Sequence, residues 1–102
     1  SNYVVVASSP TSSGCPSDVD QTYYETLDGI EQGALCLDID FVVGGCMDLG
    51  GEDPVRADCS EPMADGVRVA EIIQDSVDEF DCNTDRAYVY DEREFVVCFD
   101  SP

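Results

Sequence analysis

The sequence contains no histidine and no lysine, and its only basic residues are four arginines. Without histidine, the serine–histidine and cysteine–histidine pairs that activate a nucleophile cannot form. No Cys-x-x-C motif is present, which argues against most zinc sites and against a thioredoxin-like redox centre. A glycine-rich phosphate-binding loop is absent as well. These absences predict a protein that is not an enzyme.

Long apolar runs are also missing, and the longest is far shorter than the roughly 20 residues that a membrane-spanning helix needs. Basic charge is scarce: 23 acidic residues face four arginines, for a net charge of −19. Such a surface repels nucleic acid and anionic membranes. Cations, basic partners or solubility alone remain as explanations of the charge, and the expected partner is a protein or a cell-wall component. The acidity itself has two explanations, the composition of the source organism or a functional role.

Six cysteines are the most informative residues that are present. A chain of 102 residues buries too little surface to be very stable without help. An even number of widely spaced cysteines in so short a chain predicts three disulfides and an oxidising compartment. The expected location is therefore extracellular or in the cell envelope.

The apolar pattern predicts strands. Residues 3–7 and 95–99 are rich in β-branched side chains, and aliphatic residues alternate with polar ones and cysteine over residues 34–40. Asp28-Gly29 is typical of a hairpin turn. Residues 67–80 fit a helical face as well as a strand followed by a short helical turn, and we favour the second. The predicted fold is a small, mainly β, antiparallel domain, with an α+β fold as the alternative.

The two halves of the chain repeat the same order of features. Four pairs of blocks correspond: Val5-Val6-Ala7 with Arg68-Val69-Ala70, Cys15-Pro16-Ser17-Asp18 with Cys82-Asn83-Thr84-Asp85, Tyr23-Tyr24-Glu25 with Tyr88-Val89-Tyr90-Asp91-Glu92, and Leu35-Cys36-Leu37-Asp38 with Val97-Cys98-Phe99-Asp100. This order predicts an approximate internal repeat. The alternative is two unrelated hairpins bounded by cysteines. With the repeat, residues 1–40 form a first half-repeat packed on a complete unit, residues 41–102, in one compact globule.

The repeat selects one disulfide pairing among the fifteen that six cysteines allow. If each copy closes its own loop, Cys15 pairs with Cys36 and Cys82 pairs with Cys98. Cys46 and Cys59 are then left for each other. Each bridge is worth roughly 3 kcal/mol in the loop-entropy account.

Several short motifs carry a resemblance to a known family. They are Val43-Gly44-Gly45-Cys46, Ala57-Asp58-Cys59-Ser60-Glu61-Pro62, Cys82 with Val97-Cys98-Phe99, and, in the first half, Cys15-Pro16-Ser17-Asp18, Tyr23-Tyr24 and Leu35-Cys36-Leu37. Together they resemble small actinobacterial cell-envelope domains of the LppU-type lipoprotein and septum-formation-like kind. Gly45 stands where that pattern has an aspartate. The resemblance implies export and a cell-envelope setting, and it implies no known activity.

Four tyrosines lie close to the predicted disulfides: Tyr23, Tyr24, Tyr88 and Tyr90. Tyrosines near loops are typical of recognition surfaces, because they bury a large area at low entropic cost. They equally suit a thin core in which they cover the disulfides. Both interpretations stay open at this point.

One acidic loop has the spacing of a calcium site. Asp81, Asn83, Asp85 and Glu92 occupy positions 1, 3, 5 and 12 of an EF-hand-like loop. The sixth position is Arg86 instead of glycine, and the sequence that follows Glu92 is typical of a strand, not of a helix. A calcium-responsive structural domain is therefore an alternative function. No other cofactor is expected.

The sequence thus favours a non-enzymatic, secreted or cell-envelope module that binds a protein or a cell-wall component. A secreted microbial effector is the remaining alternative. The carboxylates of Asp38 and Asp40 alternate on one predicted strand, but close acidic pairs are expected by chance in so acidic a chain. No catalytic residue is predicted.

Overall fold

The computed structural model describes residues 2–102 and is mainly β, with two antiparallel sheets and three disulfides. Over these residues it contains eight strands and two three-residue 3-10 helices. The chain divides into two compact units, which we call unit 1 (residues 3–40) and unit 2 (residues 41–102). The mainly β prediction is confirmed, and the α+β alternative is wrong because neither helix exceeds a single turn.

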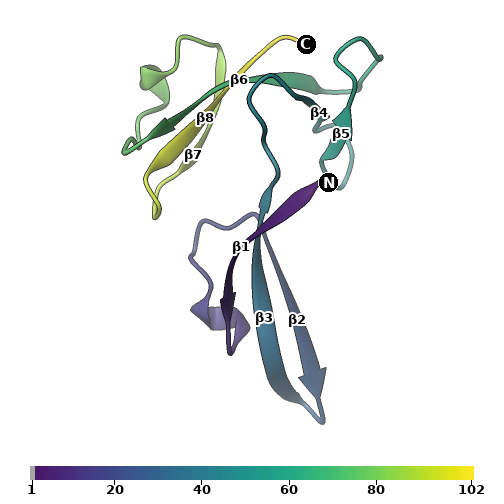
Figure 1. The fold of residues 1–102 in the computed structure, drawn as a ribbon, viewed down its shortest axis with the longest axis vertical. Coiled ribbons are helices and arrows are strands. Elements are labelled where there is room, and N and C mark those ends of the chain that lie inside the picture. Colours follow the sequence, from purple (N-terminus) through teal and green to yellow (C-terminus); the bar gives the residue numbers. More distant parts are fainter. Residues whose placement is uncertain (1) are drawn as a thin grey trace. The chain divides into compact units, whose positions relative to one another are not determined.

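Unit 1 is a three-stranded sheet in the order β1-β3-β2, with the long strand β3 in the middle (Figure 1). Its elements are β1 (Tyr3–Ser9), η1 (Ser12–Gly14), β2 (Gln21–Leu27) and β3 (Ile30–Ile39). The predicted turn joins β2 to β3, and both of its residues are left-handed: φ is 52° at Asp28 and 80° at Gly29. This conformation is the one that a tight hairpin requires and that Asp-Gly tolerates well. The Tyr23-Tyr24-Glu25 segment lies in strand β2.

One face of the unit 1 sheet is covered by the loop that links β1 to β2. The Cys15–Cys36 disulfide anchors this loop to β3. The Glu31 carboxylate accepts hydrogen bonds from the backbone N–H and the hydroxyl of Ser12, and the Asp20 carboxylate accepts one from the backbone N–H of Ile39. Within the described part of unit 1, the buried residues all lie under this loop, on one face of β3. They are Ala34, Cys36 and Asp38.

Unit 2 is a five-stranded sheet in the order β5-β4-β6-β8-β7 (Figure 1). Its elements are β4 (Cys46–Asp48), β5 (Val55–Ala57), β6 (Gly66–Gln74), η2 (Glu79–Asp81), β7 (Arg86–Tyr90) and β8 (Phe95–Asp100). Residues 67–73 are therefore extended and a short helical turn follows, as predicted. Cys46 and Cys59 close the small β4–β5 region, and Gly44 (φ 87°) turns the chain just before β4.

Both faces of β8 are buried, which gives unit 2 a real core. On the face that Phe99 occupies, five side chains are fully buried: Met47, Val67, Val69, Val97 and Phe99. The other face holds the Cys82–Cys98 disulfide with Val96, against which Ile73 and Ala87 pack. A residue buried among apolar neighbours contributes roughly 1.5–3 kcal/mol, so this core dominates the stability of unit 2.

All three disulfides join the predicted partners: Cys15 with Cys36, Cys46 with Cys59, and Cys82 with Cys98. Their Cα–Cα distances of 5.6, 5.2 and 5.6 Å are ordinary for disulfides. No cysteine among the described residues is free. No helix in the described part of the chain is long and apolar enough to cross a membrane.

The registers allow the two units to be compared position by position. In each unit a central strand, β3 or β8, lies between two antiparallel neighbours. The pairing of β1 with β3 shifts register between Val5 and Ala7, and the pairing of β6 with β8 shifts register between Val69 and Glu71. Val5 lies opposite Leu37, and Val69 lies opposite Phe99. The position of Val5 therefore corresponds to that of Val69. The block match proposed from the sequence set Val5 against Arg68, so the register comparison differs from it by one residue.

Candidate functional site

The four tyrosines predicted as a binding surface divide between two environments. Tyr23 and Tyr24 in unit 1 are about half exposed, at 55% and 52%. As neighbours on β2 they project from opposite faces of the sheet. Tyr90 in unit 2 is only 3% exposed and stacks on Phe95, with ring centroids 4.4 Å apart. The prediction that Tyr90 contributes to a recognition surface is therefore wrong, because Tyr90 is a core residue.

Tyr88 belongs to an aromatic cluster with Phe41 and Phe99. Their ring centroids are 5.8 Å apart for Phe41 and Tyr88, 5.3 Å for Tyr88 and Phe99, and 5.0 Å for Phe41 and Phe99, all edge to face. Phe99 is fully buried and Tyr88 remains partly exposed. Tyr88 thus serves mainly to cover the core, which leaves Tyr23 and Tyr24 as the tyrosines most available to a partner.

The side of the unit 1 sheet on which Tyr23 lies is apolar and exposed. Tyr23 lies opposite Leu35, Val5 opposite Leu37, and Leu27 opposite Ile30, and directly paired residues share a face. Five large apolar side chains on this face are exposed to solvent. We call them the Tyr23 face: Val5, Tyr23, Leu27, Ile30 and Leu35.

The Tyr23 face is hollowed beside the tyrosine ring. The hollow has a volume of about 350 Å³, and Tyr23, Glu25, Gly33 and Leu35 are among the residues that line it, with Ser8 on the β1 side. The Tyr23 hydroxyl donates a hydrogen bond of 3.3 Å to Oε1 of Glu25. Gly33 has no side chain to fill the space. The hollow therefore combines an aromatic wall, an aliphatic wall and one carboxylate.

In unit 2 the corresponding positions are filled. In unit 1, Glu25 lies opposite Gly33, two positions beyond the Tyr23–Leu35 pair. In unit 2, Tyr90 lies opposite Phe95, two positions beyond the Tyr88–Val97 pair. The two stacked rings of Tyr90 and Phe95 thus stand where unit 1 has a carboxylate and a glycine. The Arg93 guanidinium carbon lies 5.3 Å from each ring centroid.

Unit 1 also differs in charge. Residues 3–40 contain no arginine or lysine, and they contain seven carboxylates: Asp18, Asp20, Glu25, Asp28, Glu31, Asp38 and Asp40. All four arginines lie in unit 2. The electrostatic potential around the Tyr23 face is therefore negative, with no basic side chain of unit 1 to offset it.

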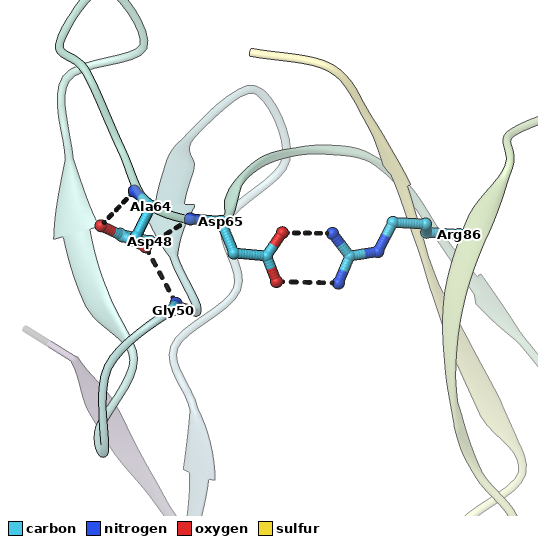
Figure 2. Close-up of polar contacts among 5 residues, drawn as sticks. All are labelled: Asp48, Gly50, Ala64, Asp65 and Arg86. Atoms are coloured by element: carbon cyan, nitrogen blue, oxygen red, sulfur yellow. Dashed lines mark hydrogen bonds and ion pairs between the residues drawn. The ribbon is translucent and has the colours of Figure 1, made fainter.

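The most elaborate polar network lies in unit 2 and is structural (Figure 2). The Asp48 carboxylate accepts backbone hydrogen bonds from Gly50, Ala64 and Asp65, at 2.9, 3.2 and 3.0 Å. The carboxylate of Asp65 in turn receives two hydrogen bonds from the Arg86 guanidinium, at 2.8 and 3.3 Å. This network ties the segment between β4 and β6 to strand β7.

Three carboxyl groups in unit 2 have a lowered pKa. Backbone hydrogen bonds, first from Gly50 and then from Asp65, lower the pKa of Asp48. The backbone N–H and the hydroxyl of Ser60 lower the pKa of Asp58. The Arg68 guanidinium, by hydrogen bonding and then by its charge, lowers the pKa of Asp100. Each environment favours the ionised form, whereas a general acid needs a raised pKa.

The residues predicted as calcium ligands do not form a ligand set. Within residues 2–102, no group of three or more acidic, cysteine or histidine side chains is placed to hold a metal. Asp81 ends η2 and its carboxylate accepts a hydrogen bond from the Ser76 hydroxyl. Asn83 and Asp85 lie in the turn before β7, and Glu92 lies in the turn between β7 and β8. An EF-hand needs a helix on each side, and η2 has three residues.

Comparison with known proteins returned no match, whether to a family model, to a curated protein or to a solved structure. Sequence reasoning found Tyr23 but missed Val5, Leu27, Ile30 and Leu35 as surface residues. Only the strand register shows that they share a face, because Ile30 and Leu35 are separated by an irregularity in the β2–β3 pairing. Apolar residues on a strand also normally mark the face that is buried.

Proposed function

We propose that this protein is a non-enzymatic binding module that docks a protein partner on the Tyr23 face of unit 1. The observation that carries the proposal is the exposure of five large apolar side chains on one side of a single small sheet, Val5, Tyr23, Leu27, Ile30 and Leu35. Contiguous exposed apolar patches rimmed by polar groups are typical of interaction sites. The opposite side of the same sheet is covered by a disulfide-anchored loop, so the exposed side is held on a rigid support.

A polypeptide is the partner class that the surface favours. The net charge of −19 repels nucleic acid and anionic lipid, and unit 1 has no basic side chain to hold a phosphate. Tyrosine and aliphatic side chains on a sheet are well suited to the side chains of another protein. A cell-wall component is the less favoured partner.

We place the protein outside the cytoplasm, in the cell envelope or in the surrounding medium. Three disulfides in so short a chain indicate an oxidising compartment. The resemblance of its cysteine motifs to actinobacterial envelope domains supports the envelope in particular. That assignment is testable by locating the native protein with an antibody in fractionated cells.

The proposal includes an internal repeat. Unit 1 and the β6–β8–β7 part of unit 2 share a strand order, a register shift on the corresponding strand, a 3-10 turn before the first bridged cysteine, and a disulfide to the central strand. We interpret the two as diverged copies of one module. In this interpretation one copy kept a covered face and the other became the docking surface.

The docking proposal can be tested with a displayed library of random linear peptides. Peptides selected on the wild-type protein are expected to bind at least about tenfold more weakly to the double variant Val5→Thr, Leu35→Thr, because each substitution removes apolar surface that the peptide would bury and leaves a hydroxyl without a partner. Val55→Thr, Val77→Thr is the control, since it removes two valines of unit 2 that are about as exposed as Val5. Binding that survives the first pair of substitutions, or a selection that yields no binder, overturns the proposal.

A further inference from the structure

We propose that the hollow beside Tyr23 receives an arginine side chain from an extended segment of the partner protein. This inference deepens the docking function proposed above and rests on it. It assigns a chemical class to the bound side chain and a role to Glu25 as its counter-charge. Tyr23 would be the ring on which the guanidinium stacks, and Leu35 would contact the aliphatic part of the side chain.

The shape and polarity of the hollow fit an arginine. Its volume of about 350 Å³ is large enough for one arginine side chain. Tyr23 supplies a ring face, and its hydroxyl holds the Glu25 carboxylate at 3.3 Å. A planar guanidinium can stack on an aromatic ring and donate two hydrogen bonds to a carboxylate, which an ammonium cannot do. The site therefore favours arginine over lysine.

An arginine also lies against aromatic rings at the corresponding hairpin of unit 2, although those rings stand at the positions of Glu25 and Gly33 and not at that of Tyr23. There Arg93, in the turn between β7 and β8, lies over both Tyr90 and Phe95. Unit 1 has Asp28-Gly29 in its turn and no arginine anywhere in residues 3–40. The cation that unit 2 supplies from its own hairpin would in unit 1 come from outside. Glu25 takes the place of Tyr90, so a carboxylate is added where the external cation would lie.

Charge decides the source of the arginine. A second copy of this chain also carries a net charge of −19, so the two copies repel each other. Two of its arginines already form ion pairs, Arg68 with Asp100 and Arg86 with Asp65, and Arg93 lies over aromatic rings. The proposed occupant is therefore a basic, extended segment of a different protein. Opposite charge also speeds the encounter of such partners.

The test uses three capped peptides that differ at one position, with the sequence Thr-Val-X-Val-Thr, where X is arginine, lysine or citrulline. Citrulline has nearly the shape of arginine but no charge. Each peptide is titrated into the whole isotopically labelled protein at low salt and followed by amide chemical shifts. The arginine peptide is expected to shift the amides of Tyr23, Glu25 and Gly33. It is also expected to bind about tenfold tighter than the citrulline peptide, with lysine in between.

Two matched pairs of variants locate the interaction. Glu25→Gln is expected to weaken the arginine peptide about fivefold and to leave the citrulline peptide unchanged. Asp28→Asn makes the same charge change at the hairpin turn and should alter neither. Tyr23→Ala is expected to weaken the arginine peptide about tenfold. Tyr24→Ala removes an equally exposed ring from the other face of β2 and should have no effect.

The outcomes separate this inference from the function on which it rests. Equal affinity for arginine and citrulline peptides, with shifts at Val5 and Leu35, overturns the arginine assignment and leaves the docking surface in place. If no peptide shifts any residue of the Tyr23 face and the library selection yields no binder, both proposals fail. Sedimentation showing a dimer that Tyr23→Ala dissociates also overturns the inference, because the occupant is then a second copy.

Discussion

Unit 1 and unit 2 contain the same arrangement of three strands and a disulfide, but one face of that arrangement is buried in unit 2 and exposed in unit 1. In unit 2 that face is the core, with Phe99 and Val97 each 1% exposed. In unit 1 the corresponding residues are Leu37, which is half-buried, and Leu35, which is exposed. A shared backbone plan therefore does not determine which face of a sheet is buried.

The difference comes from the chain segment that precedes β6. In unit 2 the edge of β6 is occupied: Gly44 donates a backbone hydrogen bond to Val69, Val69 donates one to Gly45, and β4 pairs with the start of β6. Phe41 lies against Phe99 and Tyr88. The corresponding strand of unit 1, β1, is at the edge of its sheet. One additional segment thus turns an exposed face into a core.

The sharpest test of this contrast truncates the side chain at the same position of each unit, Phe99 in unit 2 and Leu37 in unit 1. Phe99→Ala is expected to lower the free energy of unfolding of unit 2 by about 3–5 kcal/mol, because it empties a fully buried site. Leu37→Ala, at the corresponding position of unit 1, is expected to cost about 1 kcal/mol. Urea unfolding followed by residue-resolved NMR measures both. Equal costs would show that the Leu37 face is as well covered as the Phe99 face.

Removing the corresponding disulfides should affect the two units differently. Loop entropy assigns each bridge about 3 kcal/mol, since the bridged cysteines are separated by similar lengths, 21 and 16 residues. Unit 2 keeps its apolar core without Cys82–Cys98, whereas unit 1 buries few other side chains. Replacing Cys15 and Cys36 by alanine is therefore expected to unfold unit 1, and the alanine variant of Cys82 and Cys98 should leave unit 2 folded but weaker.

Amide hydrogen exchange is the measurement for these variants. In the variant without Cys15–Cys36, the amides of β3 should exchange at the rate of an unfolded chain while those of β8 stay protected. Continued protection of β3 would mean that unit 1 has a source of stability beyond the Cys15–Cys36 disulfide and its few buried residues.

A smaller effect is expected from acid, and it concerns unit 2 alone. The pKa of Asp48 is lowered below its ordinary 3.8 in the folded state. Such a group stabilises the fold above its unfolded pKa, and the contribution is lost as the pH falls through the folded pKa. Asp48→Asn keeps one acceptor oxygen but removes the charge. The difference in Tm between wild type and Asp48→Asn should be largest above about pH 5 and should vanish near about pH 2.

The wild type alone would not reveal this contribution, because protonation also relieves repulsion among 23 carboxylates. The comparison with Asp48→Asn cancels that general effect. Glu52→Gln, in the same region of unit 2, is a suitable control for the loss of one negative charge. A Tm difference that does not change with pH would show that the ionised form of Asp48 is not what the backbone N–H groups stabilise.

The smallest effect is expected from calcium. Asp81, Asp85 and Glu92 do not form a ligand set, so millimolar calcium should raise Tm no more than magnesium at the same concentration. Both ions screen the negative charge equally well. A rise specific to calcium that disappears in Asp85→Asn would restore the calcium-responsive alternative and would place a functional difference in unit 2.

Local features of the chain were predictable from the sequence. The Asp28-Gly29 turn and the strand at residues 67–73 depend on neighbouring residues and on alternation, and the disulfide pairing depends on the repeated order of motifs. The offset of one residue at Val5 arose because matching letters do not reveal a register shift. Only the pairing of β1 with β3 shows which residue lies opposite Leu37.

Burial of the tyrosines was not predictable, because it depends on distant residues. Tyr23 and Tyr88 occur in similar sequence contexts, but only Tyr88 has a partner such as Phe41, which lies 47 positions away along the chain. The hollow is equally non-local. It forms because Glu25 and Gly33, on two different strands, lie opposite each other where unit 2 has two rings.

All three disulfides lie within a unit, and this has a mechanical consequence. When the chain is pulled from its ends, the segments between bridged cysteines, with separations of 21, 13 and 16 residues, cannot lengthen. An extended residue adds at most about 3.6 Å to the end-to-end length of the chain. The residues inside the three disulfide loops cannot contribute to that length until a reductant breaks the disulfides.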